Sequence, residues 1–274
     1  MFLYILILII IALCFYSFLI EPYNIKIKKI PIYLKNLPKS FQGETILQIS
    51  DTHIKSFGKI EKKVLGLIKK INSDYIVITG DLVDHTTQSI KPCYKFFQKL
   101  TGFYDSQNIF VIFGNHIHAN KHVNNHVLGD ALRSLGINLL INENLKIKKR
   151  DGFLNIIGVD DPRTGHDDIE KAFKGIHNSD PNIFLSHCLE IKDKITTEDV
   201  DIILTGHTHG GQVKIPFIPA FWVPNIYKGK YLSGMYKINS LPIYINPGVS
   251  TTQLPVRFNA RPEITLFTLN KKVN

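Results

Sequence analysis

Five short apolar segments of this sequence end in the same way, at a polar residue of a type that binds metal ions. The segments are 46–50, 76–79, 110–113, 183–186 and 202–205. Continuous apolar runs of this length predict strands that are covered on both faces. Because ligands bind beyond the carboxyl ends of strands in α/β sheets, we expect the residues that follow to meet at one edge. These residues are Asp51, His53, Asp81, Asn115, His116, His187, His207 and His209.

The remaining apolar pattern predicts an α/β fold. Strands are expected at 45–50, 75–79, 109–113, 154–159, 183–186, 202–205, 243–246 and 263–269, and helices at 60–71, 131–135 and 168–173. Alternating strands and helices imply layered α/β architecture. The last strands follow one another without long helices, which favours mixed sheets in a sandwich flanked by helices.

The converging side chains supply only nitrogen and oxygen donors. Such a set excludes an iron–sulfur cluster and suits Mn²⁺, Fe or Zn²⁺. The donors are too many for one tetrahedral ion, which favours two ions. The three cysteines form no Cys-x-x-Cys pair, so neither a thiolate zinc site nor a disulfide framework is expected.

The first 20 residues are apolar except for Ser17. Residues 2–20 contain no charge and are just long enough to span a bilayer core of about 30 Å. A cleaved signal peptide is the alternative, but no basic residue precedes the run and no small-x-small site follows it. We therefore expect a transmembrane anchor at 1–20 and a single domain at 21–274.

Basic residues follow the apolar segment, and the net charge of the chain is +10. The positive-inside rule then places the domain on the cytoplasmic face of the inner membrane, with single-pass topology. The same lysines would lie against anionic head groups of the bilayer. The alternative is that residues 24–34 form an amphipathic strand with its lysines in water. The lysines are Lys26, Lys28, Lys29, Lys35 and Lys39.

The motifs resemble those of the calcineurin-like metallophosphoesterases in both order and spacing. They are Asp51-x-His53, Gly80-Asp81, Gly114-Asn115-His116, His187 and Gly206-His207-x-His209. The similarity continues through Asn246-Pro247-Gly248 and Leu254-Pro255-x-Arg257-Phe258. These later motifs and the apolar amino terminus make the sequence similar to the membrane-associated bacterial branch of the family. That branch includes UDP-2,3-diacylglucosamine pyrophosphatases of lipid A synthesis.

The resemblance implies a sandwich of two mixed β-sheets, two divalent metal ions (Mn²⁺ first) and hydrolysis of a phosphoester or phosphoanhydride. It implies one ion on Asp51, His53 and His209. It implies the other ion on Asn115, His187 and His207. Asp81 would bridge the ions, and His116 would contact the phosphate as a general acid.

Two positions raise questions about the site. Ile117 stands where the family usually has an acidic residue that orients the preceding histidine, so we consider Asp84 and Asp51 as substitutes. Arg257 is a candidate for binding the substrate phosphate, with Arg163 and Arg261 as further candidates. A structural ion pair is the alternative for each arginine.

Residues 215–231 are rich in proline and aromatic residues and follow the last expected ligands. They predict a loop that contacts acyl chains or the membrane, with Phe217, Phe221 and Trp222 at the lipid boundary, or a loop packed on the core.

The sequence therefore favours a membrane-anchored two-metal phosphodiesterase or pyrophosphatase with a lipid-linked substrate such as UDP-2,3-diacylglucosamine. The alternatives are a general metal-dependent phosphodiesterase, acting on a small phosphodiester, and a catalytically dead binding module at the membrane. We expect no nucleic-acid partner, because the basic runs are short and lack interleaved aromatics. No protein partner is evident.

Overall fold

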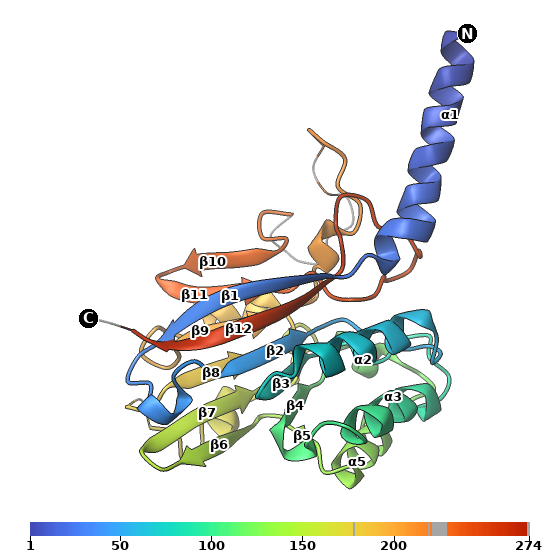
Figure 1. Cartoon of the computed structure of the whole chain (residues 1–274). Coiled ribbons are helices and arrows are strands. Elements are labelled where there is room, and N and C mark those ends of the chain that lie inside the picture. The colour runs from blue at the N-terminus through green and yellow to red at the C-terminus, as the bar shows by residue number, and fades with distance from the viewer. Residues whose placement is uncertain (178, 219, 221–228, 273–274) are drawn as a thin grey trace.

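Two six-stranded β-sheets pack face to face in the computed structural model of the chain, with helices on their outer sides (Figure 1). The structure describes residues 1–177, 179–218, 220 and 229–272. The strand orders are β1-β12-β2-β3-β4-β5 and β10-β11-β9-β8-β7-β6. Each sheet contains parallel and antiparallel pairs. The predicted fold class, an α/β sandwich of two mixed sheets flanked by helices, is confirmed.

The first sheet consists of β1 (Lys26–Leu34), β2 (Thr45–Ile49), β3 (Tyr75–Thr79), β4 (Ile109–Ile112), β5 (Asn138–Leu139) and β12 (Glu263–Lys271). The second consists of β6 (Glu143–Lys149), β7 (Gly152–Gly158), β8 (Asn182–Leu185), β9 (Ile202–Thr205), β10 (Gly234–Ile238) and β11 (Leu241–Ile245). The α-helices are α1 (Phe2–Phe15), α2 (Lys59–Ile71), α3 (Lys91–Thr101), α4 (Asn115–Ala119), α5 (Asn125–Ser134) and α6 (Ile169–Ala172).

The apolar strands divide their side chains between two layers of core. Along β3, Ile76 and Ile78 face the helix layer, while Val77 packs between the sheets. This follows from the alternation of side chains along a strand. Because both faces are covered, β2, β3, β4, β8 and β9 can be mostly apolar, and burial holds each strand in place up to its carboxyl end.

Several elements at the margins of the fold were not predicted from the sequence. The strands β1, β5, β6 and β10 were not predicted, except that β1 matches the alternative of an amphipathic strand at 24–34. Helix α3 was also missed, although Cys93, Phe96, Phe97 and Leu100 have helical spacing and are its buried residues. Its start is also marked by Pro92 in the first turn.

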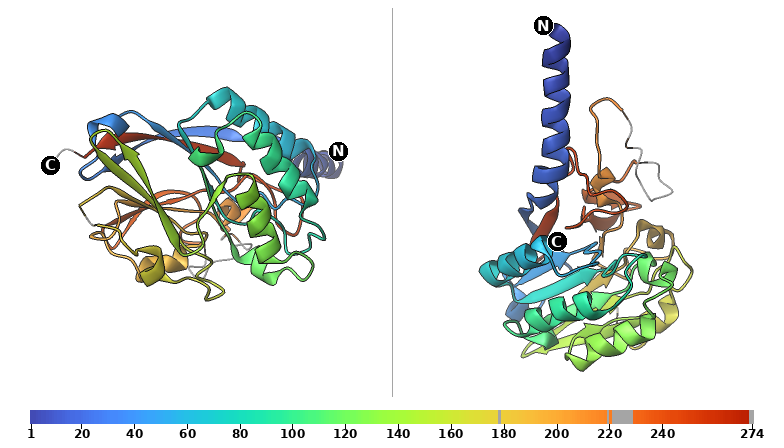
Figure 2. Two further views of the ribbon diagram at one scale, coloured as in Figure 1. Left: turned by 90° about the horizontal axis from the view of Figure 1, so that it is seen from below. Right: turned by 90° about the vertical axis from the view of Figure 1, so that its right-hand side faces the viewer.

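The amino-terminal helix stands clear of the domain (Figure 2). Helical turns continue from α1 through Tyr16–Ile20 to Glu21–Tyr23. Within the described residues, the segment Phe2–Tyr23 is the helix that is long and apolar enough to cross a membrane. No residue of α1 itself is buried, so its apolar surface has no partner among the residues that the structure describes.

The foot of this helix is docked on the domain by hydrogen bonds. The Glu21 side chain is 1% exposed, and its two carboxylate oxygens accept the backbone N–H groups of Asn259 and Ala260 at 3.0 and 2.6 Å. The backbone N–H of Arg257 donates to the carbonyl of Ser17 at 3.0 Å. Contact with the domain therefore begins at Ser17, inside the helical segment.

We expect the substitution Glu21→Gln to lower the free energy of unfolding by about 1–3 kcal/mol, because one carboxylate oxygen becomes an amide NH₂ that faces a buried N–H donor. Thermal unfolding of the detergent-purified full chain measures the change. The matched control is Glu198→Gln, at an exposed position, which should leave the melting temperature unchanged. Equal melting temperatures for Glu21→Gln and wild type would show that the carboxylate does not hold the helix foot.

Candidate metal centre

The predicted site residues follow five strands that end at one edge of the sandwich. The strands β2, β3 and β4 are mutually parallel, as are β8 and β9. In the first sheet, Asp51 and His53 follow β2, Asp81 follows β3, and Asn115 and His116 begin α4 shortly after β4. In the second sheet, His187 follows β8, and His207 and His209 follow β9. The edge predicted from the sequence is therefore the place where these residues meet.

The backbone is strained at five of these residues. Asp51, His53, Asp81, His207 and His209 have φ angles of 53°, 41°, 48°, 73° and 50°. Residues other than glycine seldom occupy this left-handed region, which costs of order 1–3 kcal/mol each in strained settings. Such outliers cluster where a side chain must point in one required direction, as a metal ligand must.

Two glycines allow neighbouring strand ends to approach closely. A Cβ atom on Gly206 would overlap the side chains of Ser50 and Asp51, and one on Gly114 would overlap the carboxylate of Asp81. These positions therefore admit only glycine while the carboxylates keep their places.

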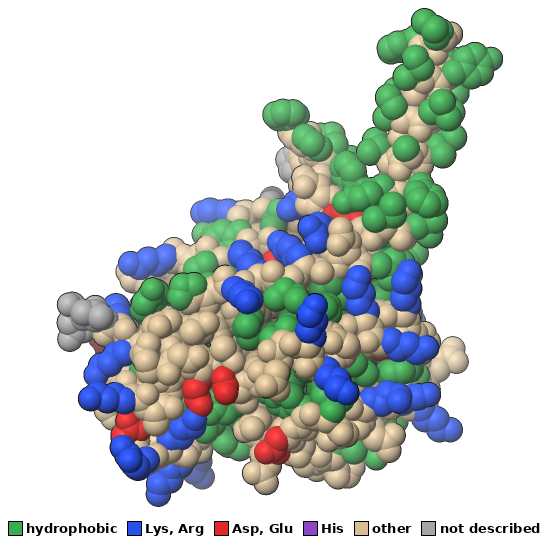
Figure 3. Space-filling model, in the orientation of Figure 1, with side chains coloured by type: hydrophobic (Ala, Val, Ile, Leu, Met, Phe, Trp, Pro, Cys, Tyr) green, Lys and Arg blue, Asp and Glu red, His purple; other side chains and the backbone are tan. Residues whose placement is uncertain are grey.

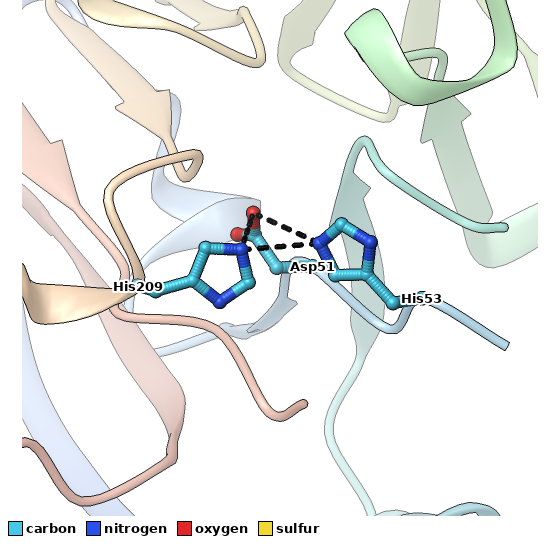
Figure 4. Close-up of side chains that lie close together, drawn as sticks. All are labelled: Asp51, His53 and His209. Carbon is cyan, nitrogen blue, oxygen red and sulfur yellow. Dashed lines mark hydrogen bonds and ion pairs between the residues drawn. The ribbon is translucent and has the colours of Figure 1, made fainter. Parts of the chain in front are cut away.

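One group of side chains consists of Asp51, His53 and His209 (Figure 4). The Nε2 atoms of the two histidines lie 3.1 Å apart, and His209 Nε2 lies 3.4 Å from Asp51 Oδ1. All three residues are buried. Their donor atoms point at a common centre, as three ligands of one ion would.

A second group consists of Asp81, His187 and His207. His187 Nε2 lies 3.1 Å from Asp81 Oδ2 and 3.1 Å from His207 Nδ1. The other ring nitrogen of His187 lies 2.8 Å from the carbonyl oxygen of Thr79 and donates to it. That hydrogen bond fixes the ring and leaves Nε2 directed at the centre, which is how metal-binding histidines are commonly oriented.

Asp81 lies between the two groups. Its Oδ2 atom is 3.6 Å from His53 Nε2 in the first group and 3.1 Å from His187 Nε2 in the second. A carboxylate placed in this way can serve both centres, so the geometry is that of a bridging ligand.

The charges of the site suit cation binding. Burial lowers the pKa of His53 to about 3 and lowers that of His209, so both imidazoles are neutral at pH 7. Burial opposes the ionisation of Asp81, but His187 and His116 outweigh it and hold the pKa of Asp81 well below its usual value. Burial likewise lowers the pKa of His187, but Asp81 outweighs it and raises that pKa to about 10. A cation that binds here must displace the His187 proton.

The side-chain oxygen of Asn115 is a further candidate metal ligand. Its Oδ1 atom is buried and has no hydrogen-bond partner among the described residues. An unpaired buried acceptor costs about 1–3 kcal/mol, and a coordinated cation would remove that cost. Together with the imidazole and carboxylate donors, this oxygen fits a divalent ion of the Mn²⁺, Fe or Zn²⁺ type.

His116 lies beside the two groups and is partly exposed. Its Nδ1 atom accepts the backbone N–H of His85 at 3.0 Å, so the neutral ring carries its proton on Nε2. Burial lowers the pKa of His116, which favours this neutral form. Its Nε2 lies 3.8 Å from Asp81 Oδ2. A proton is therefore held at the edge of the centre, as a general acid requires.

Asp84, one of the two acidic residues considered in place of Ile117, lies close to His116. Its Oδ2 atom lies 3.8 Å from His116 Nδ1 and 3.7 Å from His53 Nδ1. Although burial opposes ionisation, hydrogen bonds from Thr86 hold the pKa of Asp84 at about 2. Ile117 packs in the apolar core. Asp84 therefore lies beside the His116 ring without a hydrogen bond to it, and the ring is oriented by the His85 N–H that donates to Nδ1.

Arg257 does not have the position expected of a substrate ligand. Its side chain is fully buried, and it donates to backbone carbonyl oxygens of the surrounding loops. These belong to His209, Pro247, Gly248, Ser250 and Ala260. The expectation of a phosphate contact is corrected to a structural role, in which Arg257 fixes the loop that carries a predicted ligand.

Arg163 is the arginine that faces the centre. We use the term metal cavity for a hollow of about 190 Å³ lined by Asp81, Asn115, His116, Arg163, His207, His209, Thr252 and Gln253. Arg163 Nη1 lies 3.1 Å from His207 Nε2, at the wall of this cavity. A phosphate group in the metal cavity would therefore meet one guanidinium.

The comparisons with known proteins identify the family. A model of the calcineurin-like phosphoesterases matches residues 44–211. The chain belongs to this family. The metallophosphoesterase YkuE of Bacillus subtilis is 32% identical over 259 residues, covering 93% of this chain and 88% of that protein. A metallophosphoesterase of Helicobacter pylori is 31% identical, covering 94% of this chain and 66% of its own length.

A third relative is named a transmembrane protein with metallophosphoesterase domain, from Danio rerio. It is 26% identical and covers 90% of this chain and 57% of its own length. Together with the two groups of metal-binding side chains, family membership makes the chain a metal-dependent phosphoester hydrolase.

We expect Asp81→Ala to lose bound metal and hydrolytic activity together, because this carboxylate lies between both groups. His116→Ala should retain the metal and slow hydrolysis by about 10²–10⁴-fold, the usual contribution of a general acid. Metal content by elemental analysis and hydrolysis of bis(p-nitrophenyl) phosphate measure the two effects.

The control variant is His122→Ala, which removes an exposed histidine outside the metal cavity and should change neither quantity. Equal loss of metal in the Asp81 and His116 variants would contradict the division of roles.

Proposed function

We propose that this protein is a membrane-anchored two-metal phosphodiesterase or pyrophosphatase that acts on a lipid-linked substrate. The observation that carries the proposal is a second hollow beside the metal cavity, which extends to the foot of the apolar helix. We call this hollow, of about 430 Å³, the lateral cavity.

The lateral cavity connects the metal centre with the helix. His53 lines it at the metal centre, Tyr23 lines it at the helix foot, and Gln253 lines both this cavity and the metal cavity. Tyr23 is fixed from α2, since Lys59 lies 4.3 Å above its ring and Lys63 donates to its carbonyl oxygen at 2.6 Å. A substrate that occupies both cavities would therefore extend from the predicted metal ligands toward the membrane.

The side chains around the metal cavity support hydrolysis at phosphorus. When bound, two divalent ions polarise a phosphoryl group and lower the pKa of water. Arg163 would hold a non-reacting phosphoryl oxygen at the wall of the metal cavity. His116 would give the Nε2 proton to the leaving oxygen, and the His85 N–H that donates to its Nδ1 would keep its ring in place. We favour Mn²⁺ as the metal.

The loop after the last ligands supports a substrate with acyl chains. Ile215 and Ile218 are exposed, and Phe217 is fully exposed. Such side chains on an irregular loop are more stable against hydrocarbon than in water. Phe221 and Trp222, which the sequence analysis included in this loop, lie outside the described residues.

The location follows from the helix and its flanking charges. We propose that residues 2–20 span the inner membrane once, with the domain on the cytoplasmic face. The exposed apolar surface of α1 and the basic residues after it support this topology. The relative named a transmembrane protein points in the same direction.

The substrate is tested with the detergent-purified full chain and Mn²⁺. We expect release of UMP from UDP-2,3-diacylglucosamine with kcat/KM about tenfold above that for the same nucleotide sugar without its acyl chains. Burial of roughly 60 Å² of acyl-chain surface contributes about 1.5 kcal/mol, which corresponds to that factor.

The outcomes separate the alternatives. Hydrolysis of bis(p-nitrophenyl) phosphate without UMP release would identify a general phosphodiesterase of another substrate. No turnover of either compound by metal-loaded protein would identify a catalytically dead binding module. The Asp81→Ala protein provides the background rate in both assays.

The topology is tested by fusing alkaline phosphatase, which is active only after export, to the carboxyl terminus. We expect background reporter activity and a fusion that stays with the membrane pellet after carbonate washing. A fusion of the reporter to an exported leader provides the positive control. High activity of the fusion to this chain would reverse the proposed orientation, and release by carbonate would refute the anchor.

A further inference from the structure

A third hollow, separate in its lining from the metal and lateral cavities, lies at the foot of the apolar helix. We call this hollow, of about 280 Å³, the basic cavity. Tyr16 from the last turns of the helix, Lys26 at the start of β1, and Lys214 and Arg261 from two later segments all line it. Residues distant in sequence therefore gather three cations at one point.

The positive charge of the basic cavity is only partly balanced. Lys26 pairs with Glu263 at 2.8 Å, and Arg261 donates to the neutral side chain and carbonyl of Asn24. Glu21 is the carboxylate in the lining, but its oxygens accept two backbone N–H groups. The charge of Arg261 therefore has no ion-pair partner among the described residues.

Lys214 is the least satisfied of the three cations. Its side chain is partly buried, and no carboxylate of the described residues lies within ion-pair distance of it. Burial and the neighbouring Lys26 lower the pKa of Lys214, while Glu21 acts in the opposite direction. A partly buried ammonium beside another cation is stabilised by an anion from outside the chain.

We propose that the basic cavity binds the phosphate head group of an anionic phospholipid. The proposal rests on the membrane anchoring proposed above, because Glu21, directly after the proposed span, would then lie at the depth of the head groups, with Tyr16 about 7.5 Å deeper. Basic side chains gather below the helix foot on the face seen in Figure 3. Tyrosines and clustered basic residues at the end of a membrane helix are typical of head-group contacts.

The depth of the site distinguishes a lipid from a soluble anion. One wall is the helix that would enter the bilayer, and the next residues of that helix toward the amino terminus are apolar and exposed. A phospholipid would place its phosphate between Lys214 and Arg261 and its acyl chains along this exposed surface. A free phosphate would contact only the two cations and would lack the contacts of the acyl chains with the helix.

The test is native mass spectrometry of the full chain in neutral detergent, titrated with phosphatidylglycerol or with phosphatidylcholine of the same acyl chains. We expect one phosphatidylglycerol retained per chain and no matching retention of phosphatidylcholine. The double variant Lys214→Gln/Arg261→Gln should retain phosphatidylglycerol about 30-fold more weakly, the factor for removing two basic residues beside an anionic head group.

The matched control is Lys148→Gln/Arg150→Gln, which removes the same charge from exposed positions outside the basic cavity and should bind as wild type does. Equal retention by both double variants would refute the site, as would equal retention of the two lipids. Displacement of phosphatidylglycerol by an equal concentration of inorganic phosphate would identify a soluble-anion site and also refute the proposal.

Hydrolysis of bis(p-nitrophenyl) phosphate and a melting curve accompany each variant. We expect unchanged hydrolysis in lipid-free detergent and an unchanged melting temperature for Lys214→Gln/Arg261→Gln. If the wild-type protein hydrolyses bis(p-nitrophenyl) phosphate but retains no phosphatidylglycerol, only the lipid site is refuted. Intact retention without hydrolysis would refute only the proposed enzyme activity.

Discussion

The arrangement depends on one buried carboxylate, Asp81, which is surrounded by imidazoles. A charge inside a protein is tolerated only when opposite charges or hydrogen bonds compensate for lost hydration. His187 on one side and His53 on the other provide that environment, and His116 donates its backbone N–H to Asp81 Oδ1 at 3.0 Å. Since these partners come from both sheets, the carboxylate unites the two halves of the sandwich at its functional edge.

The sandwich explains why the ligands are found on strained backbone. Fully buried strands are rigid, so a side chain directly after a strand has little freedom in position. The chain must still turn within one or two residues, and Asp51, Asp81 and His207 adopt left-handed φ angles as a result. Packing of the core offsets the free-energy cost of this backbone strain, as is common at functional sites.

The centre of the fold and the edge at which the candidate metal ligands meet were predictable from the sequence, because each buried strand and the polar residue after it form one local pattern. Arg257 was not, because an arginine near a phosphate and an arginine inside a loop have the same local sequence. Asp84 was recognised only as one of two candidates, since its distance from His116 depends on how β3 and β4 pair. The edge strands were missed because β6 alternates too weakly and β5 has only two residues.

The docked helix foot has a mechanical consequence. Ser17 accepts a hydrogen bond from the backbone of Arg257, and the guanidinium of Arg257 donates to the carbonyl of His209. Two hydrogen bonds thus separate the helix from a predicted metal ligand. With the helix inserted in a bilayer as proposed, a change in its tilt would therefore pull on the backbone of the loop that carries His209.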